Sequence, residues 1–179
     1  MPPLPPFDPG TLCPPPGRYP LLWDEVESCL VQAPEFMHSG SRSALWTELQ
    51  AHRAQVECLF GHVSRIWLAG SFVSSKLDPS DVDLAYLIDA NAFGAITEAN
   101  DLADLANLTD REWCVKHGMR IDAYCLSLPA TEAFQDLGVA GAMAPGDAAV
   151  FQRLGTYDEV WQRTRGTRKQ RRGYVEVTL

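Results

Sequence analysis

The sequence lacks the patterns that mark several common classes of protein. Its five cysteines include no C-x-x-C pair and its four histidines are scattered, which argues against a zinc site. An odd number of cysteines is explained most simply by a reducing, cytoplasmic setting. The first residues contain no basic region followed by an apolar run, so no signal peptide is expected. No uninterrupted apolar stretch approaches the length that spans a bilayer, and we expect no membrane segment.

Positive charge is also scarce, and it is unevenly distributed. The 179 residues include 15 basic and 23 acidic side chains, for a net charge of −8, so nothing global indicates a nucleic-acid-binding protein. One basic segment, residues 163–172, is the exception. It contains six basic residues: Arg163, Arg165, Arg168, Lys169, Arg171 and Arg172.

What the sequence has at its beginning is proline. Residues 1–20 contain nine prolines, which favour an extended polyproline conformation without backbone donors. Four apolar residues can anchor this segment: Leu4, Phe7, Leu12 and Tyr19. We therefore expect an arm that lies on the body of the protein; a ligand for a proline-binding domain is the alternative. The remaining residues, 21–179, are enough for a single domain with its own core.

Apolar periodicity predicts an α/β domain, a small mixed β-sheet flanked by helices. Strands are expected at residues 65–69, 82–88 and 119–126, with 173–178 as an edge strand. Helices are expected at residues 23–32 and 42–60, over most of 91–118 with a break and a new cap at Thr109, and at 131–137. Residues 148–154 fit a helix or a strand, and 157–161 are ambiguous.

The stretch from Ile66 to Asp89 combines two apolar runs with a polar connection. Asp81 and Asp83 stand at the beginning of the second run, and side chains at positions i and i+2 of an extended strand point to the same face. Two carboxylates on one face repel each other unless a cation lies between them. Magnesium, a hard cation that prefers oxygen ligands, fits this position.

The polar connection offers a contact for phosphate. Gly70 lets the backbone approach a ligand closely, and a helix that begins near Ser71 would direct free N–H groups at a phosphate. This is not a Walker A loop, because Lys76 lacks the preceding Gly and the following Ser or Thr. An ordinary turn at residues 78–80 is the alternative explanation for the same stretch.

The stretch resembles the nucleotidyltransferase superfamily, which has the fold of DNA polymerase β, and looks closest to small bacterial and phage nucleotidyltransferase-like proteins. That family has an apolar strand, Gly-Ser or Gly-Gly, a gap, and then Asp-x-Asp or Asp-x-Glu in the next strand. Gly70, Ser71, Asp81 and Asp83 occupy these positions. The family carries a third carboxylate in a later strand, for which Asp122 is the candidate.

The resemblance implies an enzyme that transfers a nucleoside monophosphate from an NTP to an acceptor, with release of pyrophosphate. Magnesium or manganese would be held by three carboxylates: Asp81, Asp83 and Asp122. Asp122 would also help to remove the proton of the acceptor. Gly70 and Ser71 would receive the outer phosphates, with Lys76 as a further phosphate contact or, alternatively, a solvated side chain.

Three questions stay open at this point. The acceptor is a protein side chain, an RNA end or a small molecule, since the fold alone does not choose among them. A catalytically inactive module that binds a nucleotide or a partner, such as a toxin-neutralising antitoxin, is the rival function. The basic segment 163–172 either lies beside the nucleotide site, facing the triphosphate or an anionic acceptor, or is a solvated loop.

Overall fold

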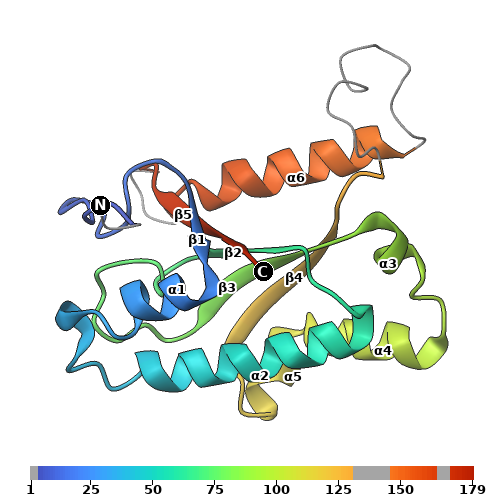
Figure 1. Cartoon of the computed structure of the whole chain (residues 1–179), viewed down its shortest axis with the longest axis horizontal. Helices are drawn as coiled ribbons and strands as arrows, with labels where there is room; N and C mark the ends of the chain where they lie inside the picture. Colours follow the sequence, from blue (N-terminus) through green and yellow to red (C-terminus); the bar gives the residue numbers. More distant parts are fainter. Residues whose placement is uncertain (1–3, 131–145, 165–169) are drawn as a thin grey trace.

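A five-stranded mixed sheet forms the centre of the computed structural model, which describes residues 4–130, 146–164 and 170–179 (Figure 1). The strands lie in the order β1-β5-β2-β3-β4. β2 is antiparallel to both of its neighbours, whereas β1 is parallel to β5 and β3 is parallel to β4. Their bounds are β1 Gly17–Leu22, β2 Arg65–Ala69, β3 Val82–Ile88, β4 Ile121–Ser127 and β5 Gly173–Thr178.

Helices cover both faces of this sheet, which confirms the expected α/β class. Figure 1 shows α6 on one face and α2, α4 and α5 on the other. Their bounds are α1 Trp23–Leu30, α2 Arg42–Phe60, α3 Ala90–Gly94, α4 Ala99–Leu108, α5 Arg111–Lys116 and α6 Asp147–Trp161, with a short 3-10 helix at Pro34–Phe36.

Two contacts show which side chains of the sheet face which layer. Tyr86 of β3 reaches His52 of α2, with 2.8 Å between its hydroxyl oxygen and the ring Nδ1. Tyr124 of β4 instead meets Tyr157 of α6, with ring centroids 5.2 Å apart. Because side chains alternate along a strand, Val82 and Tyr86 share the α2 face, and Asp83 points to the α6 face.

Several predicted elements agree closely with the structure. Strands 65–69 and 82–88 and helix 42–60 have the expected bounds, helix 23–32 ends at Leu30, and strand 119–126 is found at 121–127. The helical region 91–118 is divided into α3, α4 and α5. The new cap is Asp110 rather than Thr109, since the Asp110 carboxylate accepts hydrogen bonds from the backbone of Glu112 and Trp113.

Three expectations need correction or completion. Strand 173–178 is not an edge strand, because it lies between β1 and β2. β1 itself was not expected; it begins inside the proline-rich segment and takes the edge, the place in a sheet where Pro20 is tolerated. The two uncertain stretches 148–154 and 157–161 belong to one helix, α6. The short helix expected at 131–137 lies outside the described residues.

A membrane-spanning helix was not expected. In the described parts of the chain, no helix is long and apolar enough to cross a bilayer.

Candidate functional site

Two of the three predicted carboxylates lie side by side. Asp83 of β3 and Asp122 of β4 are register partners in a parallel pair, so their side chains share the α6 face of the sheet. Val82 between Asp81 and Asp83 is fully buried, as the alternation requires, while both carboxylates are only partly buried. The sheet thus brings two acids from strands far apart in sequence to one place.

Asp81 is engaged elsewhere. Its Oδ2 accepts a hydrogen bond of 3.0 Å from Nη2 of Arg111, at the beginning of α5, and its Oδ1 accepts one of 3.2 Å from the Ser80 hydroxyl. Among the described residues, no three His, Cys, Asp or Glu side chains form a group arranged to hold a metal ion. The three carboxylates therefore do not converge as they stand, although Asp83 and Asp122 are neighbours.

Gly70 lies directly against the carboxylate of Asp83. It follows β2 with a φ of 71°, a backbone conformation that side chains rarely adopt. A Cβ added at Gly70 would lie 1.7 Å from Oδ2 of Asp83 and 2.7 Å from its Cγ. Only glycine allows the carboxylate to occupy this place, so Gly70 and Asp83 are parts of one arrangement.

The segment after Gly70 is a turn, not the expected helix. Residues 70–73 form hydrogen-bonded turns, and residues 74 and 75 form a bend. Arg42 of α2 holds this segment from inside the protein: its guanidinium donates to the carbonyl oxygens of Phe72 (2.9 Å), Ser74 (2.7 Å) and Lys76 (2.7 Å). The prediction of a helix from Ser71 is wrong because these carbonyls are directed at Arg42 rather than at a helical turn.

Arg42 is fully buried, and its charge is balanced by oxygen atoms. A fourth hydrogen bond, of 2.7 Å, joins it to the carbonyl of Leu30, and the guanidinium lies 3.7 Å from the ring centroid of Phe36. Burial lowers the pKa of Arg42 to about 10, although the charges of Asp78 and Glu35 oppose that shift. The side chain stays protonated at neutral pH and fixes the backbone beside Gly70.

Ser71 and Lys76 are placed differently by this turn. Ser71 is half-buried next to Gly70, and its carbonyl accepts a hydrogen bond of 2.6 Å from the Ser74 hydroxyl. The side chain of Lys76 is exposed. Ser75 is tied on the other side to the proline-rich segment, through a hydrogen bond of 2.7 Å from its N–H to the carbonyl of Leu12. The turn is therefore anchored from two sides.

Arg111, which the sequence did not single out, forms an ion pair with Asp81. Its side chain is 55% exposed, compared with 21% for Asp81. The hydrogen bond to Asp81 and then the negative charges of Asp81, Asp122 and Asp83 raise the pKa of Arg111. The guanidinium thus lies in the electrostatic field of all three predicted carboxylates.

A cavity of about 370 Å³ opens beside Asp83, between the sheet and α6. Tyr124, Tyr157 and Trp161 supply aromatic walls, and Tyr157 and Trp161 are spaced i, i+4 on one side of the helix. The complete lining is Ala69, Asp83, Tyr124, Thr156, Tyr157, Val160, Trp161, Arg163 and Arg172. Its volume is within the range of small-molecule sites, about 300–1,000 Å³.

The basic segment reaches this cavity at both of its ends. Arg163 and Arg172 line it, and Arg172 Nε donates a hydrogen bond of 3.1 Å to the carbonyl of Trp161. Arg163 and Arg171 both pair with Glu159, and hydrogen bonding from Arg163 is the main reason that the pKa of Glu159 is lowered. Arg165, Arg168 and Lys169 lie outside the described residues.

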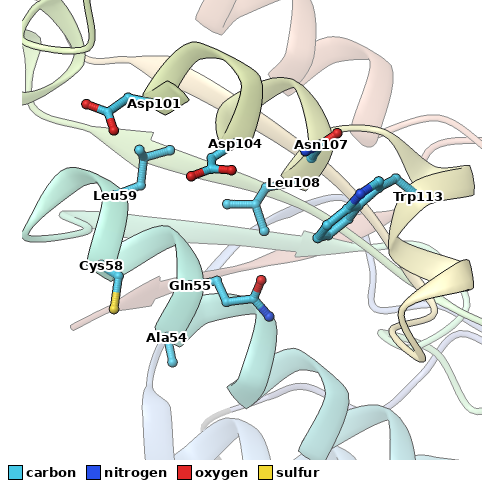
Figure 2. Close-up of a pocket in the computed structure, with 9 residues that line it drawn as sticks. All are labelled: Ala54, Gln55, Cys58, Leu59, Asp101, Asp104, Asn107, Leu108 and Trp113. Atoms are coloured by element: carbon cyan, nitrogen blue, oxygen red, sulfur yellow. The ribbon is translucent and has the colours of Figure 1, made fainter. Parts of the chain in front are cut away.

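A second cavity, of about 560 Å³, is separate from these residues. It lies between α2, α4 and α5, where Figure 2 shows Asp104 and Leu108 opposite Gln55, with the indole of Trp113 along one side. None of the predicted site residues lines it. Asp83 lines the cavity under α6 instead, on the other face of the sheet.

The sequence pointed to the acids and Gly70 but missed three contributors. Arg42 stands in an ordinary helix-start position, and nothing near it in the sequence separates it from a solvated arginine. Arg111 begins a short helix and meets Asp81 only through folding. The aromatic wall of α6 could have been predicted, because Tyr157 and Trp161 have the i, i+4 spacing that places two side chains on one side of a helix.

Comparison with known proteins adds a family but no function. No match was found among curated proteins or among solved structures. One family description, "Family of unknown function (DUF6932)", matches residues 5–178, nearly the whole chain. The chain therefore belongs to the DUF6932 family.

Proposed function

We propose that this protein is a metal-dependent nucleotidyltransferase with a polymerase-β-like fold. It transfers a nucleoside monophosphate from an NTP to an acceptor and releases pyrophosphate. The observation that carries the proposal is the pairing of Asp83 with Asp122 on one face of the sheet, against the backbone of Gly70 and beside a cavity. If residues 78–80 were only a structural turn, there would be no reason for both Gly70 and Asp122 to lie next to the Asp83 carboxylate.

The acids fit a divalent cation. Asp83 and Asp122 present carboxylate oxygens from neighbouring strands, the donor type that magnesium and manganese prefer. Asp81, two residues before Asp83, is held by an ion pair with a largely exposed partner, and such a pair contributes only about 0–1 kcal/mol. Asp81, Asp83 and Asp122 would hold the metal, which stabilises the charge that develops on a transferring phosphoryl group.

The residues of the chain supply the remaining tasks. The cavity beside Asp83 takes the nucleotide, with its base against the rings of Tyr124 and Tyr157, because aromatic stacking on a base is favourable and tolerant of its identity. Arg163 and Arg172 add positive charge to the same cavity, for the phosphates or for an anionic acceptor.

Gly70 and Ser71 receive the outer phosphates through the turn that Arg42 holds rigid, and Lys76 is a further phosphate contact. A rigid backbone matters because groups that are already in position need not be ordered during the reaction. Asp122 accepts the proton of the acceptor hydroxyl or amine. A protein side chain, an RNA end and a small molecule all remain suitable acceptors.

One observation favours the rival function, an inactive nucleotide-binding or partner-binding module such as an antitoxin. Among the described residues the three carboxylates do not form a group that is ready to hold a metal. A protein that binds a nucleotide without turnover needs the cavity and its arginines but not the convergence of the acids. The two functions therefore differ in whether the nucleoside monophosphate of a bound NTP is transferred to an acceptor.

Incubation with α-labelled NTPs, magnesium or manganese, and a cell lysate tests the proposal. The wild-type protein should transfer label to an acceptor, and Asp83→Asn and Asp122→Asn should abolish the transfer. Asp24→Asn, an exposed acid at the start of α1, is the matched control and should behave as wild type. Nucleotide binding without transfer under all of these conditions would support the inactive module. Neither binding nor transfer would reject both the enzyme and the nucleotide-binding module, and only a module that binds a partner would be left.

A further inference from the structure

Arg111 occupies a position that is hard to explain by stability alone. It pairs with Asp81 at 3.0 Å, yet 55% of its side chain is exposed. Exposed ion pairs of this kind contribute about 0–1 kcal/mol, because water screens the charges and two long side chains lose freedom. The pair nevertheless determines the state of a predicted metal ligand, since an oxygen of Asp81 is already bound.

Arg111 lies in the electrostatic field of all three predicted acids, although of these described residues only Asp81 is bonded to it. Without a metal, Asp81, Asp83 and Asp122 place three negative charges near one end of β3 and β4, and all three stabilise the charge of Arg111. A divalent cation at Asp83 and Asp122 would neutralise part of that charge and attract Asp81. Arg111 would then lose its partner next to a cation, where like charges repel.

An anionic ligand beside the metal would restore a partner for Arg111. The guanidinium is a planar fork of donors that matches phosphate oxygens, and it remains charged at any physiological pH. The cavity next to Asp83 already contains Arg163 and Arg172, so it is suited to an anion. The outer phosphates of a triphosphate carry the negative charge that Arg111 would otherwise lack.

We propose that Arg111 exchanges partners in this site. It pairs with Asp81 in the metal-free protein, and it moves to the outer phosphate oxygens of the bound NTP once the metal has taken Asp81. Arg111 is thus both a competitor of the metal and a determinant of specificity for the triphosphate over the monophosphate. The inference rests on the proposed function, because it assigns a role within the same metal and nucleotide site.

The exchange makes Arg111→Gln act in opposite directions on two ligands. Removal of the competitor should tighten the binding of Mn²⁺ alone by about twofold to fivefold, the equivalent of one exposed ion pair. Loss of the phosphate contact should weaken the binding of a non-hydrolysable NTP analogue, with metal, by about tenfold, as expected for a charge-assisted hydrogen bond. The affinity for the matching nucleoside monophosphate should change little.

Binding of both ligands is measured on the full chain, with free Mn²⁺ followed by electron paramagnetic resonance and the nucleotides by calorimetry. Arg153→Gln, which removes an exposed arginine of α6 that does not line the cavity, is the control and should match wild type for every ligand. In an Asp81→Asn background, Arg111→Gln should no longer tighten Mn²⁺ binding, because the pair that competes is already absent. Arg111→Lys should retain part of the triphosphate preference.

The outcomes separate this inference from the proposed function. If wild type binds Mn²⁺ and the NTP analogue, but Arg111→Gln leaves both affinities unchanged or weakens both, the exchange is overturned and the nucleotide site stands. An equal loss of affinity for triphosphate and monophosphate would also overturn it. If wild type binds neither ligand, the proposed function fails and the exchange fails with it.

Discussion

At the scale of single residues, Gly70 is the position where the site tolerates no side chain. Gly70→Ala should lower both the stability and the metal affinity, because the new Cβ would lie 1.7 Å from the Asp83 carboxylate and the backbone φ is 71°. The backbone conformation alone costs about 1–2 kcal/mol for a residue with a Cβ. Chemical denaturation gives the loss of stability, and Mn²⁺ titration gives the loss of affinity.

Gly61 provides a matched control for this substitution. Its φ is 76°, but nothing lies within 4 Å of an added Cβ. Gly61→Ala should therefore show the cost of the backbone conformation alone, and Gly70→Ala should cost more. In an Asp83→Ala background the two costs should become similar, since the clashing carboxylate is gone. Equal costs in the wild-type background would show that Asp83 moves away freely.

His52 is a residue whose buried position gives a pH dependence. Its Nε2 donates a hydrogen bond of 2.9 Å to the carbonyl of Leu108, because a carbonyl only accepts, so Nδ1 accepts from the Tyr86 hydroxyl in the neutral ring. Burial lowers the pKa of His52, although the hydrogen bond to Leu108 opposes this. A protein with such a histidine loses stability as the pH falls below about 6.5, where the unfolded state takes up the proton first.

We therefore expect the melting temperature to fall between pH 7 and pH 5 in wild type, and to fall less in His52→Phe. His62→Gln, at an exposed histidine, should retain the wild-type slope. Parallel slopes for all three proteins would mean that His52 does not contribute to the acid sensitivity. His52 is a structural residue in this fold, since it is fully buried and both of its ring nitrogens are hydrogen-bonded.

At the scale of elements, the sequence predicts what local patterns determine. Mainly apolar runs predict β2 and β3, and a helical period of apolar residues predicts α2, each with the observed bounds. β1 escaped prediction because the prolines around it indicate an extended arm, and only pairing with β5 makes it a strand. α6 was divided in the prediction because Gly155 and Thr156 interrupt its pattern.

In the candidate site, too, the sequence predicts the residues of local patterns but not the contacts between distant residues. Asp81, Asp83 and Gly70 belong to one local stretch. Asp122 was predicted only because the resembling family carries a third carboxylate in a later strand, flanked by apolar residues. The turn after Gly70 could not be predicted, because it depends on hydrogen bonds from Arg42, whose chain position is 30 residues from Phe72. Contacts of this range, including Arg111 with Asp81, exist only after the sheet has formed.

The arginines at the junction of α6 and the basic segment should affect nucleotide binding to different degrees. Arg172→Ser should weaken nucleotide binding about threefold to tenfold and make it less dependent on salt, because one cation facing the cavity is lost. Arg163→Ser should have a smaller effect, since Arg163 is already paired with Glu159. Both affinities are measured by calorimetry over a series of salt concentrations.

Arg171→Ser is the control from the same segment. Arg171 pairs with Glu159 at 3.1 Å and does not line the cavity, so its loss should leave nucleotide affinity near the wild-type value. If Arg171→Ser and Arg172→Ser weaken binding equally, the effect is one of general charge and not of the cavity. If neither changes binding, these two arginines take no part in nucleotide binding.

At the scale of the whole molecule, the two faces of the sheet differ in what they can do. The face towards α2 is filled by apolar side chains and by the His52–Tyr86 contact. The other face carries Asp83, Asp122 and the cavity under α6. The segment before β1 is bonded both to the turn after Gly70 and to β5. The carbonyl of Leu12 accepts a hydrogen bond from Ser75 of the turn, and the carbonyl of Pro14 accepts one from Gly173 of β5. The site is thus built from most of the chain, and its ligands should stabilise the fold as a whole.

Ligand binding to this composite site should raise the melting temperature of the entire domain. A ligand at 100 times its Kd that binds only the folded state adds about 2.7 kcal/mol of stability. For a domain of about 150–250 residues that corresponds to roughly 5–10 °C. Millimolar magnesium or manganese with an NTP should produce a shift of this size in wild type and in Asp24→Asn, whereas Asp83→Asn should keep its fold and lose most of the shift. Because no single segment provides the ligands, a shift confined to one local probe, or no shift with any of the four common NTPs, would contradict a metal and nucleotide site between β3, β4 and α6.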